Sequence, residues 1–285
     1  MSNLESMYQA VQFVERHLKE PVSVQDVADA AGYSLYHFSR TFNRVIGHSP
    51  YDYIMRRRLS ESARELLESG KRIIDIAIEY QFNNPETYTR AFRSMFGAPP
   101  NQVRKNKRLS NLIFKSRVTL EYIQHINQGD YVRPKYVERG AIHLVGMVTL
   151  VKDQADARGE LREKLGYEVE TIVNRLVPER YYGVSFFPLA WEMEGFFHMV
   201  GVEVASLETI PSLLVGKTIP PLKYARFIHK GPSRDVGMTF DYIYQTWLPK
   251  SGNTLAVPLE IEFYGERYRG PDDQASESEI FIPIG

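Results

Sequence analysis

A pattern of aromatic residues, arginine, glycine and proline occurs twice in the first hundred residues, and it constrains the fold most. The first copy, at 38–50, begins Phe-Ser-Arg-Thr-Phe and ends with a glycine and a proline. The second copy, at 88–100, begins Tyr-Thr-Arg-Ala-Phe and ends in the same way. Apolar residues at this spacing lie on one face of a helix, which spans about 35–46 in the first copy. The duplicated apolar face predicts a duplicated fold unit.

Each copy is the second half of a predicted helix-turn-helix. Upstream of the first copy, Ser23 is a helix N-cap for a short helix at 24–31, which ends at a glycine. The segment 73–77 repeats this short helix ahead of the second copy. A short helix, a tight turn and a second helix make a helix-turn-helix. A long helix at about 51–68 separates the two motifs, and an amphipathic helix at 4–18 precedes them.

The two faces of the repeated helix have different predicted roles. The aromatic residues of the apolar face are predicted to be core: Phe38, Phe42, Tyr88 and Phe92. The polar face carries an arginine at the same position in both copies, Arg40 and Arg90. A helix-turn-helix places the polar face of its second helix in the DNA major groove. Arginine can bind guanine there through two hydrogen bonds. The alternative for both arginines is an ordinary solvated surface.

Two motifs joined by a rigid helix can enter successive major grooves, about 34 Å apart, without dimerisation. The residues predicted to contact bases are Tyr36, Ser39, Arg40, Glu86, Thr89 and Arg90. The residues predicted to contact phosphates, which position the protein without reading sequence, are Arg44, Arg93, Arg104, Lys105, Lys107 and Arg108. Only the arginine is shared between the two sets of readers. The sequence therefore predicts an asymmetric DNA site bound by a monomer.

A long ordered set of residues in this region carries a family resemblance. The set is Val27-Ala28, Ala31-Gly32-Tyr33-Ser34, His37-Phe38-Ser39-Arg40-Thr41-Phe42, Gly47, Tyr53-Ile54, Arg57-Arg58-Leu59, Ile74-Asp75-Ile76-Ala77, Gln81-Phe82, Thr89-Arg90-Ala91-Phe92-Arg93, Phe96-Gly97 and Pro100. With it, residues 5–106 resemble the DNA-binding domain of AraC/XylS-type transcription regulators, most closely the MarA/SoxS/Rob branch. The resemblance implies that both recognition helices contact bases through the six positions named above.

Composition excludes several other classes of protein. The chain has 285 residues and no cysteine, which excludes disulfide scaffolds, thiolate metal sites and cysteine nucleophiles. No apolar run approaches the ~20 residues that a membrane helix needs. The N-terminus has no secretory signal pattern, so we expect a cytoplasmic protein. No Ser/His/Asp set, metal cluster or phosphate loop is present in the sequence, so we expect no catalytic residue, no metal and no cofactor.

The second half of the chain has a different pattern. Segment 112–126 is interpreted as linker with one strand, and a polar amphipathic helix is predicted at 157–175. Strand, helix, strand and strand then occur in this order twice, which is typical of an α+β domain of two βαββ units. The domains are predicted at 5–108, for two helix-turn-helix motifs, and at 131–285, with a linker at 109–130.

The last strands carry the candidate ligand-binding residues. In 259–264 the residues Glu260, Glu262 and Tyr264 point to one side, and in the final strand Glu279 and Phe281 point away from the core. We expect both strands to present carboxylates and an aromatic ring to one surface. A half-buried carboxylate beside aromatic faces attracts a cation. Trp191, on a preceding loop, has the right chemistry to line the same site. The alternative is a solvated strand face.

A second resemblance supports this interpretation. The matching residues are Val145-Gly146, Tyr224-Ala225-Arg226-Phe227, His229-Lys230-Gly231-Pro232, Tyr242-Ile243, Trp247-Leu248-Pro249-Lys250-Ser251-Gly252, Leu259-Glu260-Ile261-Glu262-Phe263-Tyr264 and Ile282-Pro283-Ile284. Segment 131–285 thereby resembles the gyrase-inhibitor-like effector-binding domain. The resemblance implies a concave sheet whose groove binds hydrophobic cations, with Glu262 favoured, then Glu260 and Glu279, and with Tyr224 in the lining.

These observations predict a transcription regulator that is not an enzyme. Its expected partners are double-stranded DNA and a small hydrophobic or cationic effector, with RNA polymerase as a further partner and no membrane. Two alternatives remain for the second domain. One is a domain that contacts RNA polymerase or another protein and binds no ligand. The other is a small-molecule hydrolase that uses Glu and Tyr in the groove.

Overall fold

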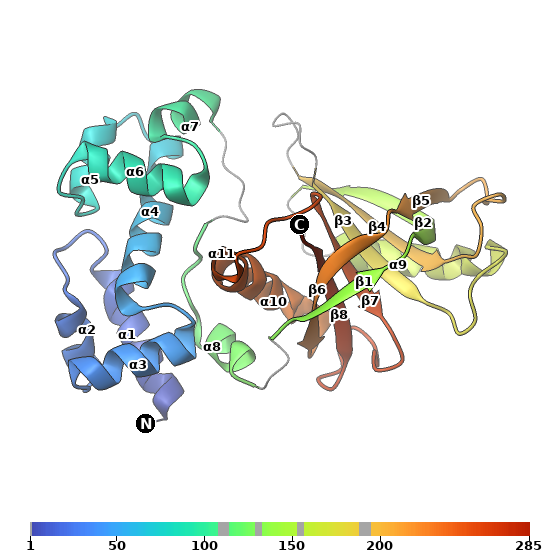
Figure 1. The fold of residues 1–285 in the computed structure, drawn as a ribbon, viewed down its shortest axis with the longest axis horizontal. Coiled ribbons are helices and arrows are strands. Elements are labelled where there is room, and N and C mark those ends of the chain that lie inside the picture. Colours follow the sequence, from blue (N-terminus) through green and yellow to red (C-terminus); the bar gives the residue numbers. More distant parts are fainter. Residues whose placement is uncertain (1, 108–113, 129–132, 153–156, 188–194) are drawn as a thin grey trace. The chain divides into compact units, whose positions relative to one another are not determined.

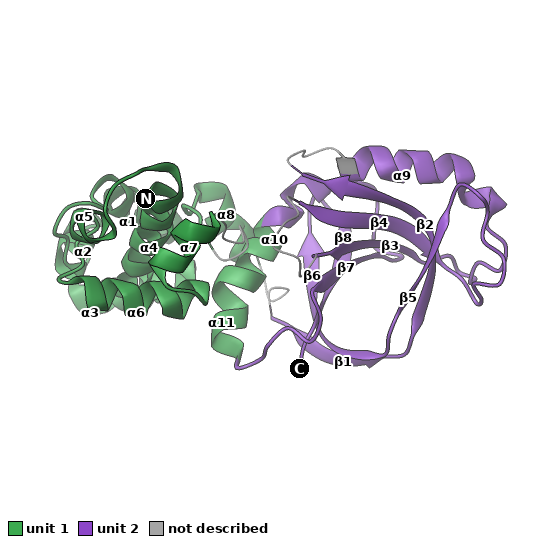
Figure 2. Ribbon diagram, turned by 90° about the horizontal axis from the view of Figure 1, so that it is seen from above, with its two compact units in different colours: residues 1–129, 238–251 green, residues 130–237, 252–285 purple. Residues whose placement is uncertain are grey.

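The computed structural model describes residues 2–107, 114–128, 133–152, 157–187 and 195–285. The chain forms two compact units, shown in green and purple in Figure 2. Unit 1 comprises Met1–Gly129 and Met238–Ser251, and unit 2 comprises Asp130–Gly237 and Gly252–Gly285. A segment late in the chain therefore belongs to the first unit.

Helices make up unit 1 where the structure describes it (Figure 1). Its N-terminal part contains α1 (Asn3–Arg16), α2 (Val24–Ala30), α3 (Leu35–Ile46), α4 (Pro50–Glu68), α5 (Ile73–Glu79), α6 (Pro85–Phe96), α7 (Pro100–Asn106) and α8 (Leu120–Ile126). Its late segment contains most of α10 (Val236–Tyr242), a π-helical turn (Ile243–Trp247) and α11 (Leu248–Ser251).

The predicted pair of helix-turn-helix motifs is confirmed, as α2–α3 and α5–α6 joined by α4. Local chemistry sets the helix boundaries. The Ser23 side chain accepts a hydrogen bond from the backbone N–H of Asp26 and begins α2, and Asn84 caps α6 in the same way. Both recognition helices end at a left-handed glycine, with φ of 79° at Gly47 and 77° at Gly97. Glycine adopts this conformation without steric cost and stops the helix.

The repeated aromatic residues hold two separate cores, as predicted. Phe38 and Phe42 are fully buried with residues of α1 and α2. Tyr88 and Phe92 are fully buried with residues of α4 and α5. In each helix the two rings are about 5 Å apart, at 5.3 Å in α3 and 5.5 Å in α6. Each recognition helix is therefore anchored by its apolar face, and its other face is free for binding.

The strand predicted within 112–126 is not found in the described residues 114–126, where α8 forms from Leu120 instead, and residues 112 and 113 lie outside the described residues. Thr119 caps this helix by accepting a hydrogen bond from the backbone N–H of Tyr122. Tyr122 and Ile123 are buried in the first core. An isolated helix of this length is unstable in water. Packing against the first core therefore stabilises α8, whereas its β-branched and aromatic residues suggested a strand.

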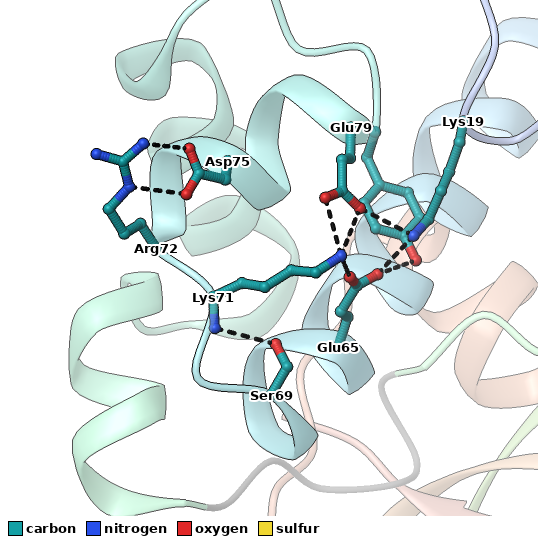
Figure 3. Close-up of polar contacts among 8 residues, drawn as sticks. Lys19, Glu65, Ser69, Lys71, Arg72, Asp75 and Glu79 are labelled. Carbon is teal, nitrogen blue, oxygen red and sulfur yellow. Dashed lines mark hydrogen bonds and ion pairs between the residues drawn. The ribbon is translucent and has the colours of Figure 1, made fainter.

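An ion-pair network joins three segments of unit 1 (Figure 3). Glu65 of α4 pairs with Lys19 at 2.8 Å and with Lys71 at 2.5 Å. Glu79 of α5 pairs with the same two lysines, at 3.0 and 2.8 Å. The hydrogen bonds from Lys19 and Lys71 lower the pKa of Glu65 to about 2. The network ties the chain after α1 to the second helix-turn-helix.

Unit 2 is built on one antiparallel sheet with the strand order β1-β6-β8-β7-β3-β4-β2-β5. The strands are β1 (Lys135–Arg139), β2 (Ile142–Val151), β3 (Tyr181–Phe186), β4 (Phe196–Glu203), β5 (Val215–Ile219), β6 (Leu222–Lys230), β7 (Leu259–Tyr264) and β8 (Glu277–Pro283). Two βαββ units are present, β2-α9-β3-β4 and β6-α10/α11-β7-β8, so the α+β prediction is confirmed. The helix predicted at 157–175 is shorter, because α9 (Ala157–Glu168) gives way to a 3-10 turn at Val169–Thr171.

The sheet has an apolar layer on each face. On one face Leu161 and Leu165 of α9 pack against Val145, Val200 and Val202. The opposite face has its own buried cluster, and the sheet curls so that β1 and β5 lie on the side away from α9 (Figure 2). Side chains on either face of the sheet can therefore be buried.

Candidate nucleic-acid interface and effector pocket

The predicted base-reading residues of α3 lie on its solvent face. Tyr36 is 79% exposed, Arg40 and Arg44 are exposed, and Ser39 is half-buried. They follow the helical period opposite Phe38 and Phe42, which fill the core. The α3 helix therefore presents one continuous polar face.

The equivalent face of α6 is also open. Glu86, Arg90 and Arg93 are exposed, and Thr89 is half-buried. Together with Pro85 and Ser94 these residues line a surface hollow. Both predicted reader sets thus occupy equivalent faces of equivalent helices.

Arginines of unit 1 divide into two kinds. Within the described residues, Arg40 and Arg90 have no side-chain hydrogen bond or ion pair and are exposed. In contrast, Arg57 of α4 is buried and pairs with Glu15 at 2.8 Å. Its neighbour Arg58 is also buried and donates to the carbonyl oxygen of Leu18. The arginines of α4 stabilise the fold, whereas those of α3 and α6 are available to a partner.

The late segment of unit 1 contacts the C-terminal end of α3. His48 Nε2 lies 3.1 Å from Thr246 Oγ1, and its Nδ1 lies 2.6 Å from Asp52. The Lys250 ammonium donates to the carbonyl oxygen of Gly47. Burial lowers the pKa of His48 to about 4, so its ring is neutral at physiological pH. Sequence analysis did not anticipate these contacts.

A buried lysine lies in the same contact region. Lys115 is 2% exposed, and burial lowers its pKa to about 7. Asp241 of α10 faces it and opposes this shift. Nearby, the backbone N–H of Ser116 donates to Gln245 at 3.3 Å. Lys115 and Ser116 therefore interact with Asp241 and Gln245 of the late segment.

A cavity of about 440 Å³ lies beside α9 in unit 2. Its apolar wall includes Leu165, Val169 and Val200, and its polar wall includes Arg162. Four tyrosines also line the cavity: Tyr181, Tyr182, Tyr264 and Tyr268. An apolar pocket of this size with a few polar groups is typical of small-molecule sites, which occupy about 300–1,000 Å³.

The predicted ligand-binding residues do not share one surface, so that expectation is wrong. In the register between the last two strands, Glu262 is opposite Ile280 and Phe263 is opposite Glu279. Side chains opposite each other lie on the same face. The set on the α9 face is Glu260, Glu262 and Tyr264, and the set on the other face is Tyr224, Glu279 and Phe281. Trp191 lies outside the described residues.

Glu262 is a buried carboxylate two residues before Tyr264 on β7, whereas the carboxylates that line the cavity itself are Glu179 and Glu266. Glu262 is 5% exposed, and burial raises its pKa. Ser278 Oγ donates to it at 3.4 Å, and the Tyr264 hydroxyl and the positive charges of Arg158 and Arg162 act on its pKa in the opposite direction to burial. Gly183 lies directly opposite on β3, where an added Cβ would lie 3.1 Å from Tyr264 Oη. The absence of a side chain at Gly183 therefore leaves room for the Tyr264 hydroxyl.

The other face is occupied by an arginine of the chain. The Arg139 guanidinium lies 4.8 Å from the ring centroid of Phe281 and 5.8 Å from those of Tyr182 and Phe263. It donates to Tyr182 Oη at 3.1 Å. The Glu279 carboxylate of this face is engaged by Arg226. The cavity of about 440 Å³ is lined by residues of α9, so the α9 face holds the candidate effector pocket.

Sequence reasoning missed Arg162, although a signal was present. Arg158 and Arg162 are four residues apart and interleave with Leu161 and Leu165, which face the sheet. Long basic side chains often cover apolar surface in this way with their charge in water. The sequence pattern alone does not show whether the two arginine charges lie in water or near a buried carboxylate.

The described part of the chain shows neither a metal centre nor a membrane-spanning helix. No group of three His, Cys, Asp or Glu side chains there could hold a metal ion. None of the described helices has both the length and the apolar composition needed to span a bilayer.

Known families match both units. A model described as a helix-turn-helix domain matches residues 27–106. A model described as a GyrI-like small molecule binding domain matches residues 133–285, more than half of the chain. The second match includes α10 and α11, which pack in unit 1.

Curated relatives match the whole chain or a part of it. The right origin-binding protein of Escherichia coli K12 is 32% identical over 291 residues, with 95% of each chain covered. Transcriptional regulator Rob of Salmonella typhimurium is 42% identical over 98 residues, 34% of each chain. The multiple antibiotic resistance protein MarA of Salmonella typhimurium is 32% identical over 126 residues, which cover 44% of this chain and 93% of MarA. The chain therefore belongs to the AraC/XylS family of DNA-binding transcription regulators, in its form with a GyrI-like small-molecule-binding domain.

Proposed function

We propose that this regulator, which is not an enzyme, binds as a monomer to an asymmetric DNA site by inserting α3 and α6 into successive major grooves. One observation carries the proposal. The two recognition helices are joined by the continuous helix α4, and they expose Arg40 and Arg90 at equivalent positions. The other residues proposed to contact bases differ between the two helices, so the two helices should recognise different base sequences. A regulator that binds chromosomal DNA in this way works in the cytoplasm.

The proposed effector is a small hydrophobic cation bound in the cavity beside α9. Tyr264 and Tyr268 supply aromatic faces in the lining, and Glu262, two residues before Tyr264 on β7, supplies a buried negative charge on the same face of the sheet. Aromatic rings and a carboxylate together attract a desolvated cation. The apolar wall of Leu165, Val169 and Val200 suits the remainder of such a molecule.

Selection of bound sequences from random duplexes tests the DNA part of this proposal. The selected site should be asymmetric and should contain two short conserved blocks one helical turn apart, about 10 base pairs. Sedimentation of the complex should give one chain per duplex. A palindromic site with two chains bound would contradict the proposal.

A further inference from the structure

An arginine of the chain lies where a cationic effector would bind. The Arg162 guanidinium carbon is 4.6 Å from the ring centroid of Tyr264 and 5.8 Å from that of Tyr268. The two rings are themselves 4.7 Å apart. A cation within about 6 Å of a ring centroid is attracted by the ring quadrupole. Both aromatic faces that could attract a foreign cation are already near a positive charge.

Hydrogen bonds hold this guanidinium against both tyrosines. Its Nη2 atom donates to Tyr264 Oη at 2.8 Å, and its Nη1 atom donates to Tyr268 Oη at 3.1 Å. The Tyr264 hydroxyl and the Arg162 charge both favour the ionised form of Glu262. The Nε atom of Arg162 is buried and has no hydrogen-bond partner within the described residues. One N–H group of the Arg162 guanidinium is therefore buried in this position without a hydrogen bond to the described part of the chain.

A second arginine, one turn earlier on α9, extends the positive charge. The Arg158 guanidinium lies 5.2 Å from the ring centroid of Phe196. The positive charges of Arg158 and Arg162 both favour the ionised form of Glu262. The helix that covers the pocket thus supplies the counter-charge that a buried carboxylate requires.

We infer that Arg162 is the resident cation of the effector pocket, and that a cationic effector binds only by displacing its guanidinium. The inference rests on the proposed function, because it concerns the same pocket and the same class of effector. A foreign cation that reaches the rings of Tyr264 and Tyr268 occupies the volume around the guanidinium. A cation therefore binds only if its interactions with the pocket outweigh those that the Arg162 guanidinium loses.

The displaced guanidinium has weaker partners available at the rim. Glu266 and Glu179 line the same cavity and are exposed, and Glu179 already pairs with Arg175 at 2.8 Å. An ion pair at such an exposed position contributes little, because water and salt screen it. Displacement therefore has a net cost, which lowers the affinity for cations relative to a pocket without the arginine.

Isothermal titration of the full-length protein with tetraphenylphosphonium and with tetraphenylborate tests this inference. The two probes have the same shape and opposite charge. Arg162→Met keeps a long apolar stem and removes the charge, so it should bind the phosphonium roughly tenfold more tightly than the wild type. The same variant should bind the borate no more tightly. Arg162→Lys keeps a positive charge and should remain close to the wild type with both probes.

The matched control is Lys164→Met on the same helix, since that side chain is 66% exposed and pairs only distantly with Glu160. It should leave both affinities unchanged. Circular dichroism checks folding, and Arg162→Gln replaces the methionine variant if the latter is unfolded. Equal gains in Arg162→Met and Arg162→Lys would overturn the inference, as would an Arg162→Met variant with unchanged or weaker phosphonium binding.

The outcomes also separate the inference from the proposed function. Phosphonium binding by the wild type with no gain in Arg162→Met leaves the effector class standing and rejects the resident cation. Binding by Arg162→Met alone supports the resident cation directly. Binding by neither folded protein rejects the proposed effector class, and the inference with it.

Discussion

The Nε2 atom of His48 lies 3.1 Å from Oγ1 of Thr246, although the two residues are 198 positions apart. His48 follows Gly47, which ends the first recognition helix. Thr246 lies within the range matched by the GyrI-like model. The end of a DNA-reading helix is therefore held by a segment that the sequence assigns to the effector domain.

Thr246→Val tests the importance of this contact, because it keeps the side-chain shape and removes the hydroxyl. A buried group left without its hydrogen bond costs about 1–3 kcal/mol. We expect the free energy of unfolding, measured in urea, to fall by about that amount. The change in operator affinity caused by a bound effector should also become smaller. Thr209→Val, at an exposed position, is the control and should alter neither quantity.

Arg40→Ala and Arg90→Ala should each weaken binding to the selected operator by roughly 1–3 kcal/mol, because each removes a bidentate base contact. Fluorescence anisotropy on the operator and on a random duplex measures this loss. Binding to random DNA should change much less. Arg16→Ala removes an exposed charge from α1 and provides the comparison. An equal loss on both duplexes would assign the arginines to phosphate contacts.

Glu262→Gln should weaken the binding of tetraphenylphosphonium, because it removes the negative charge beside the pocket. Burial raises the pKa of Glu262, and only the ionised form attracts a cation. Wild-type affinity should therefore rise with pH through this raised pKa, whereas the variant should show no such rise. Titration calorimetry at several pH values measures both effects. Glu279→Gln, on the opposite face of the sheet, should behave as the wild type.

Glu65→Gln should reduce stability at neutral pH by about 1 kcal/mol or less, as expected for a surface network. The pKa of Glu65 is about 2 in the folded protein and near 4.5 when unfolded. Its stabilisation is complete above the unfolded value and is lost as pH falls through the folded value. Thermal unfolding of the variant should depend less on pH between about 5 and 2. Glu68→Gln, exposed on the same helix, should retain the wild-type pH profile.

Periodicity predicted the helical unit well because its information is local. Helix α4 was expected at 51–68 and spans Pro50–Glu68, and the cores around Phe42 and Phe92 lie where the spacing placed them. Helix α8 was missed for the converse reason. Its seven residues are stabilised by burial of Tyr122 and Ile123 in a core made by distant residues.

The alternation of residue types predicted which residues of one strand share a face. It did not predict which faces of two neighbouring strands lie on the same side of the sheet. Glu260, Glu262 and Tyr264 do share a face of β7. The relation to Glu279 depends on the register of β7 with β8, which the connecting segment sets. A shift of one residue reverses every side chain. The positions of Arg139 and Arg162 likewise depend on contacts far apart in sequence.

The placement of residues 238–251 in the first unit limits how this chain can exchange parts with its relatives. A hybrid joined anywhere in the 108–132 interval would pair the reading helices with another protein's version of that segment. The new segment would meet Gly47, where even an added Cβ would lie 2.7 Å from Thr246 Cγ2. Sensor and reader in this lineage are therefore expected to change together, and a working chimera must carry a segment that matches its host.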